Sequence, residues 1–470
     1  MTKEVNNKVA LKSGIWYVVG DVLFRTIGFL TMPIFTRVLS KAEFGQFNNI
    51  TSWGLILFLI VSLDLNSSII RAKVDYEDEL SSYSSSILIL STVTNILFYV
   101  IVRLNVGFFS ELFAIDAKYF DILFPYFLFL EAYYIFVTYE RANYRYKTFT
   151  LSTGLVVILV NALSILLVFT MDDKLTARVL GFHLPYILVG AFMYFAILKR
   201  DRNIKWEYIK YALAISLPML PHLISLNILS SSDKVMITQM VGQEANAVYS
   251  VAYTISNIMV IIYVAMNKAW APWFLDTMKS GDRSNIKKAS KYYMLLFVAM
   301  IFGVSLIGPE IILILGGPKY AEASYVLVPL LVSTIVQFAY SIYLQVEIYE
   351  KRFKTVSFAT AVAAIVNLGL NFLLIPKYGY VVAGYTTLIG YLISLFLHYN
   401  TVRSMGYSKL VNSKMIMTGV AISIASIPLL TLVLYRYRFI RWGILVIYAL
   451  GFLYIILKNF RKILGFLKKK

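Results

Sequence analysis

The sequence contains no cysteine among its 470 residues, and this absence excludes a disulfide framework, a thiol nucleophile and a thiolate metal site. Histidine is scarce as well, because the three that occur, His183, His222 and His398, lie far apart and share no metal-ligand spacing. The sequence also lacks a G-x-x-x-x-G-K phosphate-binding motif and any loop long enough to form a soluble catalytic domain. We therefore expect no enzymatic activity, no metal site and no cofactor.

Charged residues are sparse, at 15% of the chain, whereas hydrophobic residues make up 59% and the mean hydropathy is +0.72. Soluble domains carry about a quarter charged residues. Apolar runs of about 20 residues recur from end to end, each long enough to cross a hydrocarbon core of about 30 Å. They predict an all-α integral membrane protein with about 14 transmembrane helices. The expected ranges are 14–36, 44–63, 84–102, 121–139, 149–170, 179–198, 211–232, 248–266, 292–309, 325–345, 356–375, 380–399, 415–434 and 440–457.

The start of the chain and the placement of its charges predict an orientation. The first thirteen residues are polar and no small-residue cleavage site follows the first apolar run, so we expect that run to be a retained anchor. The net charge is +19, and lysine and arginine concentrate in alternate loops. This bias predicts that both termini lie in the cytoplasm, and it explains the basic balance without nucleic acid. One loop, with Arg436, Arg438 and Arg441, disagrees with the bias.

Three pairs of segments match weakly, in the same order and at similar offsets. The pairs are IFTRVLSKAEFGQFN (34–48) with MITQMVGQEANAVYS (236–250), AKYFDILFPYFL (117–128) with PKYAEASYVLVPLL (318–331), and YRYKTF (144–149) with KRFKTV (351–356). Six helices separate equivalent points, so both halves enter the membrane from the same side as parallel repeats with a cavity between them. We expect six-helix bundles at 1–200 and 201–405, followed by helices 13 and 14 and a basic cytoplasmic tail at 406–470.

Several polar groups fall within the expected helices, where a charge costs about 2.5–3.5 kcal/mol on insertion scales. Arg25 lies near the middle of the first helix, with Asp21 one turn earlier on the same face. One interpretation is a self-neutralised structural pair. The other is that Arg25 meets an anion in a water-filled cavity while Asp21 orients it.

Three more charges raise similar alternatives. Glu131, in the middle of the fourth helix, predicts either structural hydrogen bonding or proton binding, because burial favours the neutral carboxyl group. Asp64 ends the second helix, and Arg71 follows it in a stretch that we expect to be a solvated cytoplasmic loop. Arg71 could also approach the mouth of the cavity.

The expected seventh helix is unusually polar. Pro218 and Pro221 interrupt its early hydrogen bonding, which is tolerated where the freed carbonyls face protein or water. We predict that these prolines form a hinge. His222, Asn227, three serines and then Asp233 continue as a polar ladder, with Lys234 beside Asp233 near the outer interface. The alternatives are a cavity-lining helix, or tight packing through serine with an interfacial ion pair.

The stretch SLPMLPHLISLNILSSSDKVMI (216–237) resembles the seventh-helix signature of bacterial polysaccharide-biosynthesis flippases, the Wzx-type transporters. TRVLSKAEFGQFN (36–48) is similar to the hinge after their first helix, and ILGGPKYAEA (314–323) to the loop before their helix ten. The 6 + 6 + 2 layout fits the multidrug/oligosaccharidyl-lipid/polysaccharide exporter superfamily. These motifs mostly specify the fold.

The resemblance implies a function in the bacterial cytoplasmic membrane. The family moves an undecaprenyl-pyrophosphate-linked oligosaccharide repeat unit from the inner to the outer leaflet by alternating access. The pyrophosphate would suit Arg25, with Lys268 and Arg71 as candidates for initial capture, since a guanidinium forks onto phosphate oxygens. The expected partners are this lipid-linked sugar, the bilayer, and a polysaccharide polymerase with chain-length proteins.

Three rival functions stay open. A multidrug or cation antiporter of the same superfamily would need an intramembrane acid, for which Glu131 or Asp233 could serve, but Arg25 disfavours a cationic substrate. A membrane-embedded polymerase or ligase would be expected to carry a long outside loop with catalytic charges. A non-transporting scaffold would leave the charges in the helices unexplained.

Overall fold

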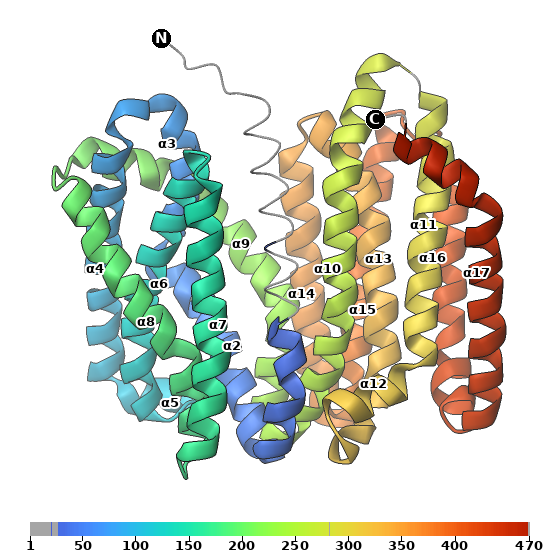
Figure 1. Cartoon of the computed structure of the whole chain (residues 1–470), viewed down its shortest axis with the longest axis horizontal. Coiled ribbons are helices and arrows are strands. Elements are labelled where there is room, and N and C mark those ends of the chain that lie inside the picture. Colours follow the sequence, from blue (N-terminus) through green and yellow to red (C-terminus); the bar gives the residue numbers. More distant parts are fainter. Residues whose placement is uncertain (1–19, 21–26, 282, 469–470) are drawn as a thin grey trace. The chain divides into compact units, whose positions relative to one another are not determined.

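The computed structural model describes Gly20, residues 27–281 and residues 283–468, and every regular element within them is helical (Figure 1). An apolar helix, Ile27–Val38, comes first. The first unit's longer helices follow as α2 (Lys41–Ser62), α3 (Ile69–Asp75), α4 (Leu80–Leu104), α5 (Val106–Phe113), α6 (Ala117–Ala142), α7 (Tyr146–Thr170), α8 (Lys174–Arg200) and α9 (Trp206–Met240). The chain continues as α10 (Gln243–Ser280), α11 (Arg283–Leu306), α12 (Gly308–Leu315), α13 (Ser324–Tyr349), α14 (Phe353–Tyr378), α15 (Val381–Ser404), α16 (Ser413–Pro428) and α17 (Arg438–Lys468).

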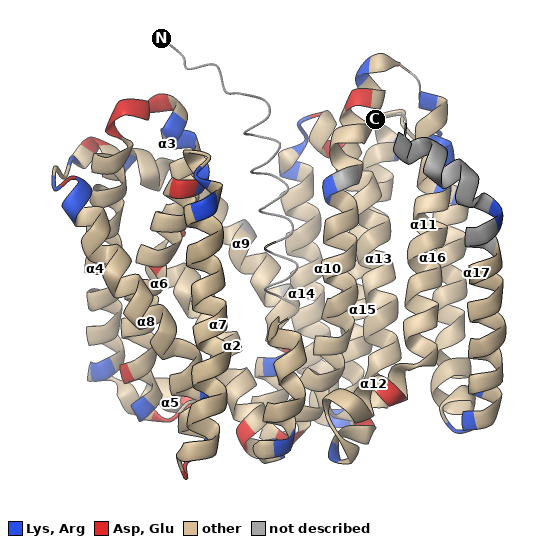
Figure 2. Cartoon of the chain, in the orientation of Figure 1, with Lys and Arg blue, Asp and Glu red and all other residues tan. Residues whose placement is uncertain are grey.

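Twelve helices in the described part of the chain are long and apolar enough to cross a membrane, and Ile27–Val38 is a shorter apolar helix. Figure 2 shows that most charged residues lie near the ends of the helices, which leaves their middles free to face hydrocarbon. The predicted all-helical membrane architecture is confirmed. The number fourteen stays a prediction, because the first expected helix begins outside the described residues.

The chain divides into two compact units. The first comprises residues 1–250 and 364–380, and the second comprises 251–363 and 381–470. Helices α10 and α14 each contribute to both units. The bundles expected at 1–200 and 201–405 stay a prediction about internal repetition, which a division into compact units does not test.

One connection is repeated in detail. Three residues separate the end of α6 from α7, which begins at Tyr146, and three separate the end of α13 from α14, which begins at Phe353, at an offset of 207. Tyr144 and Lys351 occupy the same place in the two connections and have φ angles of 55° and 56°. A positive φ is uncommon outside glycine. The third sequence match (144–149 with 351–356) is therefore also a match of backbone conformation.

The same backbone hydrogen bond closes both turns. The amide of Arg145 donates to the carbonyl of Glu140 at 2.9 Å, and the amide of Arg352 donates to the carbonyl of Glu347 at 2.8 Å. Each bond satisfies a carbonyl of the last helical turn that would otherwise lack a partner. The two connections thus end their helices in the same way and hold Glu140 and Glu347 at equivalent positions.

Close helix contacts hold the first unit together. Gly45 of α2 faces the start of α10 so closely that a Cβ atom there would lie 1.8 Å from the carbonyl oxygen of Gln243. The side-chain amide of Asn246 donates to the carbonyl of Gly45 at 2.9 Å and locks this approach. The interior of the first unit is rich in aromatic rings, and α8 packs along both α6 and α7. In a membrane, close packing of this kind replaces the hydrophobic effect as the source of helix association.

Candidate functional site

The anion site predicted from the first helix cannot be placed, because Arg25 and Asp21 lie outside the described residues. The side chain of His222 lies outside them as well. The roles predicted for these three residues therefore stay predictions. The other candidates fall on described helices, and the structure brings some of them together.

The C-terminal half of α9 carries a buried polar network. Asp233 is 2% exposed, and its carboxylate accepts hydrogen bonds from the hydroxyl of Tyr249 at 2.5 Å and from the amide of Asn371 at 2.6 Å. Asn371 also donates to the side-chain oxygen of Asn367 at 3.4 Å, which in turn accepts from Ser232 at 3.5 Å. The network joins α9 to the parts of α10 and α14 that belong to the first unit.

The composition of this network determines which ions it could bind. It contains one carboxylate, surrounded by amide and hydroxyl groups, in a part of the fold that excludes solvent. Oxygen ligands of this kind suit hard cations, and a single carboxylate balances the charge of one proton or one monovalent cation. In the structure, Asn371 and Tyr249 donate hydrogen bonds to the carboxylate without balancing its charge. The sequence predicted the polar residues of α9 but not their partners on α14.

Two other carboxylates singled out in the sequence, Asp64 and Glu131, lie at a break that follows α2. Helix α2 stops at Ser62, Leu63 and Asp64 take φ angles of 53° and 50°, and a 3₁₀ turn, Leu65–Ser68, precedes α3. Glu131 is fully buried and accepts hydrogen bonds from the backbone amide of Asn66 at 3.0 Å and from its side chain at 3.1 Å. Glu131 therefore satisfies amide groups that the break leaves open.

An arginine that the sequence analysis did not single out lies inside the first unit. The guanidinium of Arg178, on α8, stacks on the ring of Phe35 at 3.7 Å and lies 4.5 Å from the ring of Phe47. One nitrogen donates to the hydroxyl of Ser164 at 2.6 Å, whereas Nε is buried and has no hydrogen-bond partner. Among the described residues, Arg178 forms no ion pair with a carboxylate. It is a cation held by aromatic faces.

Arg178 was missed because of a boundary. The predicted sixth helix started at residue 179, so the arginine counted as part of a loop. The structure starts α8 at Lys174, with Asp173 as the N-cap, and this places Arg178 one turn inside the helix. The Asp173-x-x-Thr176 spacing is a capping signal that could have set the boundary earlier.

Of the remaining charged candidates, Arg71 and Lys268 lie at helix surfaces and Lys234 is partly buried. Arg71 is exposed on α3 and pairs with Asp75 one turn later, at 3.0 Å. Lys268 is exposed on α10, and Lys234 is partly buried next to Asp233. Among the described residues, no hydrogen bond or ion pair joins Arg71 to the polar network around Asp233.

The polar features of the N-terminal part of α9 stay within the helix. The amide of Asn227 donates to the carbonyl of Leu223 in its own helix at 3.0 Å. Pro218 and Pro221 both lie inside α9, which runs without interruption from Trp206 to Met240. The hinge predicted at these prolines stays a prediction.

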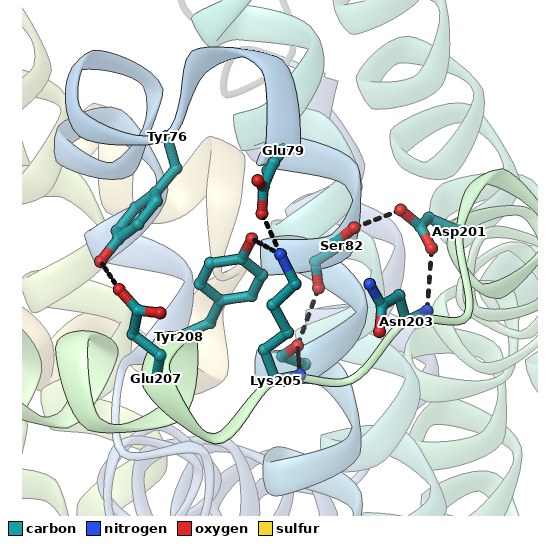
Figure 3. Close-up of polar contacts among 9 residues, drawn as sticks. Tyr76, Glu79, Ser82, Asp201, Asn203, Lys205, Glu207 and Tyr208 are labelled. Carbon is teal, nitrogen blue, oxygen red and sulfur yellow. Dashed lines mark hydrogen bonds and ion pairs between the residues drawn. The ribbon is translucent and has the colours of Figure 1, made fainter.

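The start of α9 is fastened to α4 through the connection from α8 (Figure 3). Ser82 donates to the carboxylate of Asp201, and the backbone amide of Asn203 donates to the same side chain at 2.8 Å. These donors hold the pKa of Asp201 below its usual range. The ammonium of Lys205 contacts Glu79, and the hydroxyl of Tyr76 donates to Glu207 at 3.2 Å. These contacts link the start of α9 to the connection from α8 and to the segment around the start of α4.

The model of the family described as polysaccharide biosynthesis protein matches residues 10–278, which is more than half of the chain. The chain belongs to this polysaccharide biosynthesis protein family. The relationship predicted from the motifs is thus confirmed at the level of the family.

Several relatives and solved structures are similar to this chain. A protein of the Lsg locus of Haemophilus influenzae is 20% identical over 76% of this chain and 88% of its own length. A second membrane protein of that organism is 21% identical, over 76% and 89%. The inward closed structure of the lipid II flippase MurJ has a TM-score of 0.70 at 15% identity, covering 94% of this chain and all of that one. An inward-facing multidrug transporter of the MATE family gives 0.61 at 16%, covering 82% and 95%. The structural likeness shows a shared fold.

Proposed function

We propose that this protein is a flippase that moves an undecaprenyl-pyrophosphate-linked oligosaccharide from the inner to the outer leaflet of the bacterial cytoplasmic membrane by alternating access. Membership of the polysaccharide biosynthesis family supports a role in making a surface polysaccharide. The likeness to a lipid II flippase supports a fold able to carry a lipid-linked sugar. As part of the same proposal, both termini of this protein lie in the cytoplasm and a polysaccharide polymerase acts nearby.

The observation that carries the proposal is the environment of Arg178. A guanidinium within a membrane-spanning helix normally has a carboxylate partner, because an unpaired charge in a low-dielectric interior is costly. Here the described partners are three aromatic rings and one hydroxyl, and Nε is left without an acceptor. A phosphate oxygen would supply that acceptor and the missing negative charge, since guanidinium groups bind phosphate through paired N–H donors.

Arg178 therefore joins Arg25 as a candidate ligand of the pyrophosphate. Arg178 lies on α8, whereas Arg25 is predicted for the first membrane segment, so one could receive the substrate while the other releases it. A pyrophosphate carries about two negative charges and cannot cross hydrocarbon unaided, which is why a pathway for it needs cations. The sugar part needs polar contacts, for which the α9 network and its serines are candidates.

The proposal is tested by flipping in proteoliposomes. A fluorescent polyprenyl-pyrophosphate oligosaccharide is placed in one leaflet, and its appearance in the other is followed for wild type, Arg178→Ala, Arg178→Lys and Arg25→Ala. We expect Arg178→Ala to lower the rate at least tenfold and Arg178→Lys to keep part of it. Arg103→Ala is the matched control, because Arg103 is an exposed arginine at the end of α4 that pairs with Asp121 at 3.6 Å.

The same assay separates the main alternative. A cation antiporter of the superfamily would use a buried acid, and Asp233 fits that role through its burial. If wild type moves no lipid-linked sugar from a varied panel but exports a cationic dye, the antiporter is correct and Asp233→Asn should abolish export. If wild type flips the lipid and Arg178→Ala flips it equally well, the flippase stands and Arg178 is not an anion site.

A further inference from the structure

The second unit contains a buried acid–imidazole pair between α13 and α15. The Nδ1 atom of His398 lies 2.5 Å from Oε1 of Glu347, and the two side chains are 1% and 0% exposed. The hydroxyl of Thr355 donates to the other carboxylate oxygen at 2.7 Å. The ring of Tyr340 stacks on the imidazole at 5.3 Å. The carboxylate is therefore removed from water, and the group that can balance its charge is a histidine.

The first unit has the same arrangement with a different cation. Glu140, at the position equivalent to Glu347, is also buried, with its side chain 1% exposed. Arg200 donates to it at 2.7 Å, and Arg145 approaches it at 3.6 Å. Arg200 comes from α8, which packs on α6 as α15 packs on α13. Both units thus bury one glutamate beside the repeated turn and pair it with a cationic side chain from the neighbouring long helix.

The two cations differ in one chemical property. An arginine stays protonated at every physiological pH, so the Glu140–Arg200 pair keeps its charge balance. A histidine gains and loses its proton between roughly pH 5 and 8. When His398 is neutral, its Nδ1–H can still donate to Glu347, but the buried negative charge is no longer balanced. An unbalanced buried charge weakens the packing around it, because its desolvation is then uncompensated.

We propose that the Glu347–His398 pair is a proton-binding site that controls how tightly the end of α13 is held to α15. One proton from water adds to the imidazole and completes an ion pair. Its release leaves a buried carboxylate and loosens this end of the second unit. The site goes beyond the proposed flippase function and does not depend on it, although a flippase could use such a proton to drive or time its cycle.

The proton has a short path. Thr355, which contacts the carboxylate, is partly exposed, and residues 351–354 before it are exposed. The pair is therefore one side chain away from the surface at the α13–α14 turn. The equivalent turn of the first unit is also exposed around Tyr144, so access does not distinguish the two sites.

The groups around the pair do not supply a second buried carboxylate in the described part of the chain. Tyr340 faces the imidazole and lies 6.1 Å from the ring of Tyr391, on α15. Glu350, one residue after the end of α13, accepts a hydrogen bond from the hydroxyl of Tyr407 at 2.6 Å. Other titratable or charged groups on α10, α11, α13, α15, α16 and the turn at the start of α14 include Tyr263, Lys268, Lys291, Tyr293, Tyr343, Arg352, Lys354, Tyr399, Arg403 and Lys414.

The first test observes the proton directly. The chain has three histidines, so the protein labelled with [¹⁵N]histidine and held in lipid nanodiscs gives three imidazole spin systems. The system that disappears in His398→Gln belongs to His398. We expect its nitrogen shifts to move between the neutral and charged values from pH 5 to 8.5, and to stop moving in that way in Glu347→Gln. Shifts that stay constant over this range in wild type would overturn the proposal.

The second test observes the loosening and has a matched control within the chain. Lys354 and Lys147 are exposed lysines at equivalent positions, in the first turn of α14 and of α7. Because the natural chain has no cysteine, Lys354→Cys or Lys147→Cys carries the only thiol and can be labelled with an environment-sensitive dye. We expect the emission of the dye to change with pH at position 354 and to stay constant at position 147.

Exchange of the two cations sharpens this test. His398→Arg should abolish the pH response at position 354, and Arg200→His combined with Arg145→Ala should create one at position 147, because Arg145 also approaches Glu140. An unchanged response at 354 in His398→Arg, or an equal response at both positions in wild type, would contradict the proposal. Flipping rates measured at pH 5.5 and 8 then show whether transport uses the proton. Absence of flipping at any pH would count against the proposed function, while the spectroscopic result would still decide the proton site.

Discussion

The side-chain amide of Asn371 donates a hydrogen bond to the carboxylate of Asp233 at 2.6 Å, although 138 residues separate them in the sequence. Both side chains are buried, at 0% and 2% exposure. The bond ties the C-terminal half of α9 to α14 in a buried place where water cannot replace a lost partner. Polar contacts of this kind both stabilise a helix pair and limit the ways in which the helices can move against each other.

Replacement of Asn371 by alanine removes one donor from this buried carboxylate. We expect Asn371→Ala to lower the free energy of unfolding by about 1–3 kcal/mol, the usual cost of a buried polar group that loses its partner. Thermal unfolding in detergent, followed by tryptophan fluorescence, measures the change. Asn48→Ala is the control, because Asn48 donates to the carbonyl of Phe44 in its own helix. Equal changes in unfolding free energy for the two variants would mean that the hydrogen bond between the helices adds nothing to stability.

Gly45 is predicted to tolerate no side chain. A Cβ atom at this position would lie 1.8 Å from the carbonyl oxygen of Gln243, and backbone atoms cannot move aside cheaply. We expect Gly45→Ala to destabilise the protein by at least about 1–3 kcal/mol, the range for overpacked interiors. Gly28→Ala is the matched control on the helix Ile27–Val38, where a Cβ atom would meet nothing within 4 Å. That variant should be neutral or slightly stabilising, and a similar loss in both would refute the steric explanation.

Glu131 is predicted to hold the break between α2 and α3. It accepts hydrogen bonds from the backbone and the side chain of Asn66, and a glutamine has one oxygen with which to replace the two of the carboxylate. We expect Glu131→Gln to speed hydrogen exchange of the amides in the 3₁₀ turn, Leu65–Ser68, at least tenfold. Mass spectrometry of the peptide that covers this turn gives the rate. An unchanged rate in the turn would show that Glu131 does not hold it.

Asp173 gives a prediction for acid pH. It caps α8, and hydrogen bonds from the hydroxyl and the backbone amide of Thr176 lower the pKa of this exposed carboxyl group to about 2. A carboxyl group whose pKa is lowered on folding stabilises the protein above its unfolded value of about 3.9, and this contribution disappears as the pH falls toward 2. Wild type should therefore lose more stability than Asp173→Asn between pH 5 and 3, because asparagine keeps the cap without titrating.

The control for this acid dependence is Asp116, which precedes α6 but makes no capping hydrogen bond through its side chain. Asp116→Asn should leave the acid dependence of wild type unchanged. Melting temperatures at several pH values, in the same detergent, provide the comparison. If Asp173→Asn and wild type lose stability in parallel, the capping hydrogen bonds do not contribute.

Much of the architecture was predictable because hydrocarbon imposes a strict length and polarity on each helix. The apolar runs gave the helices, and the match of 144–149 with 351–356 gave a turn that the structure repeats. Boundaries were less accurate where a polar cap extends a helix, as at Asp173, and that error concealed Arg178. The sequence placed Asp233 and Glu131 correctly on helices but could not provide Asn371 or Asn66, since partners that lie far apart in the chain leave no local signal.

Glu140 and Glu347 have a last consequence, which concerns the comparison of two sites within a single chain. The two sites lie in one molecule, at the same concentration, and have the same turn beside each glutamate. The difference between them, arginine in one and histidine in the other, can therefore be examined against a fixed background. Exchanging residues between the halves asks which differences matter, and the chain itself provides both the mutant and the reference.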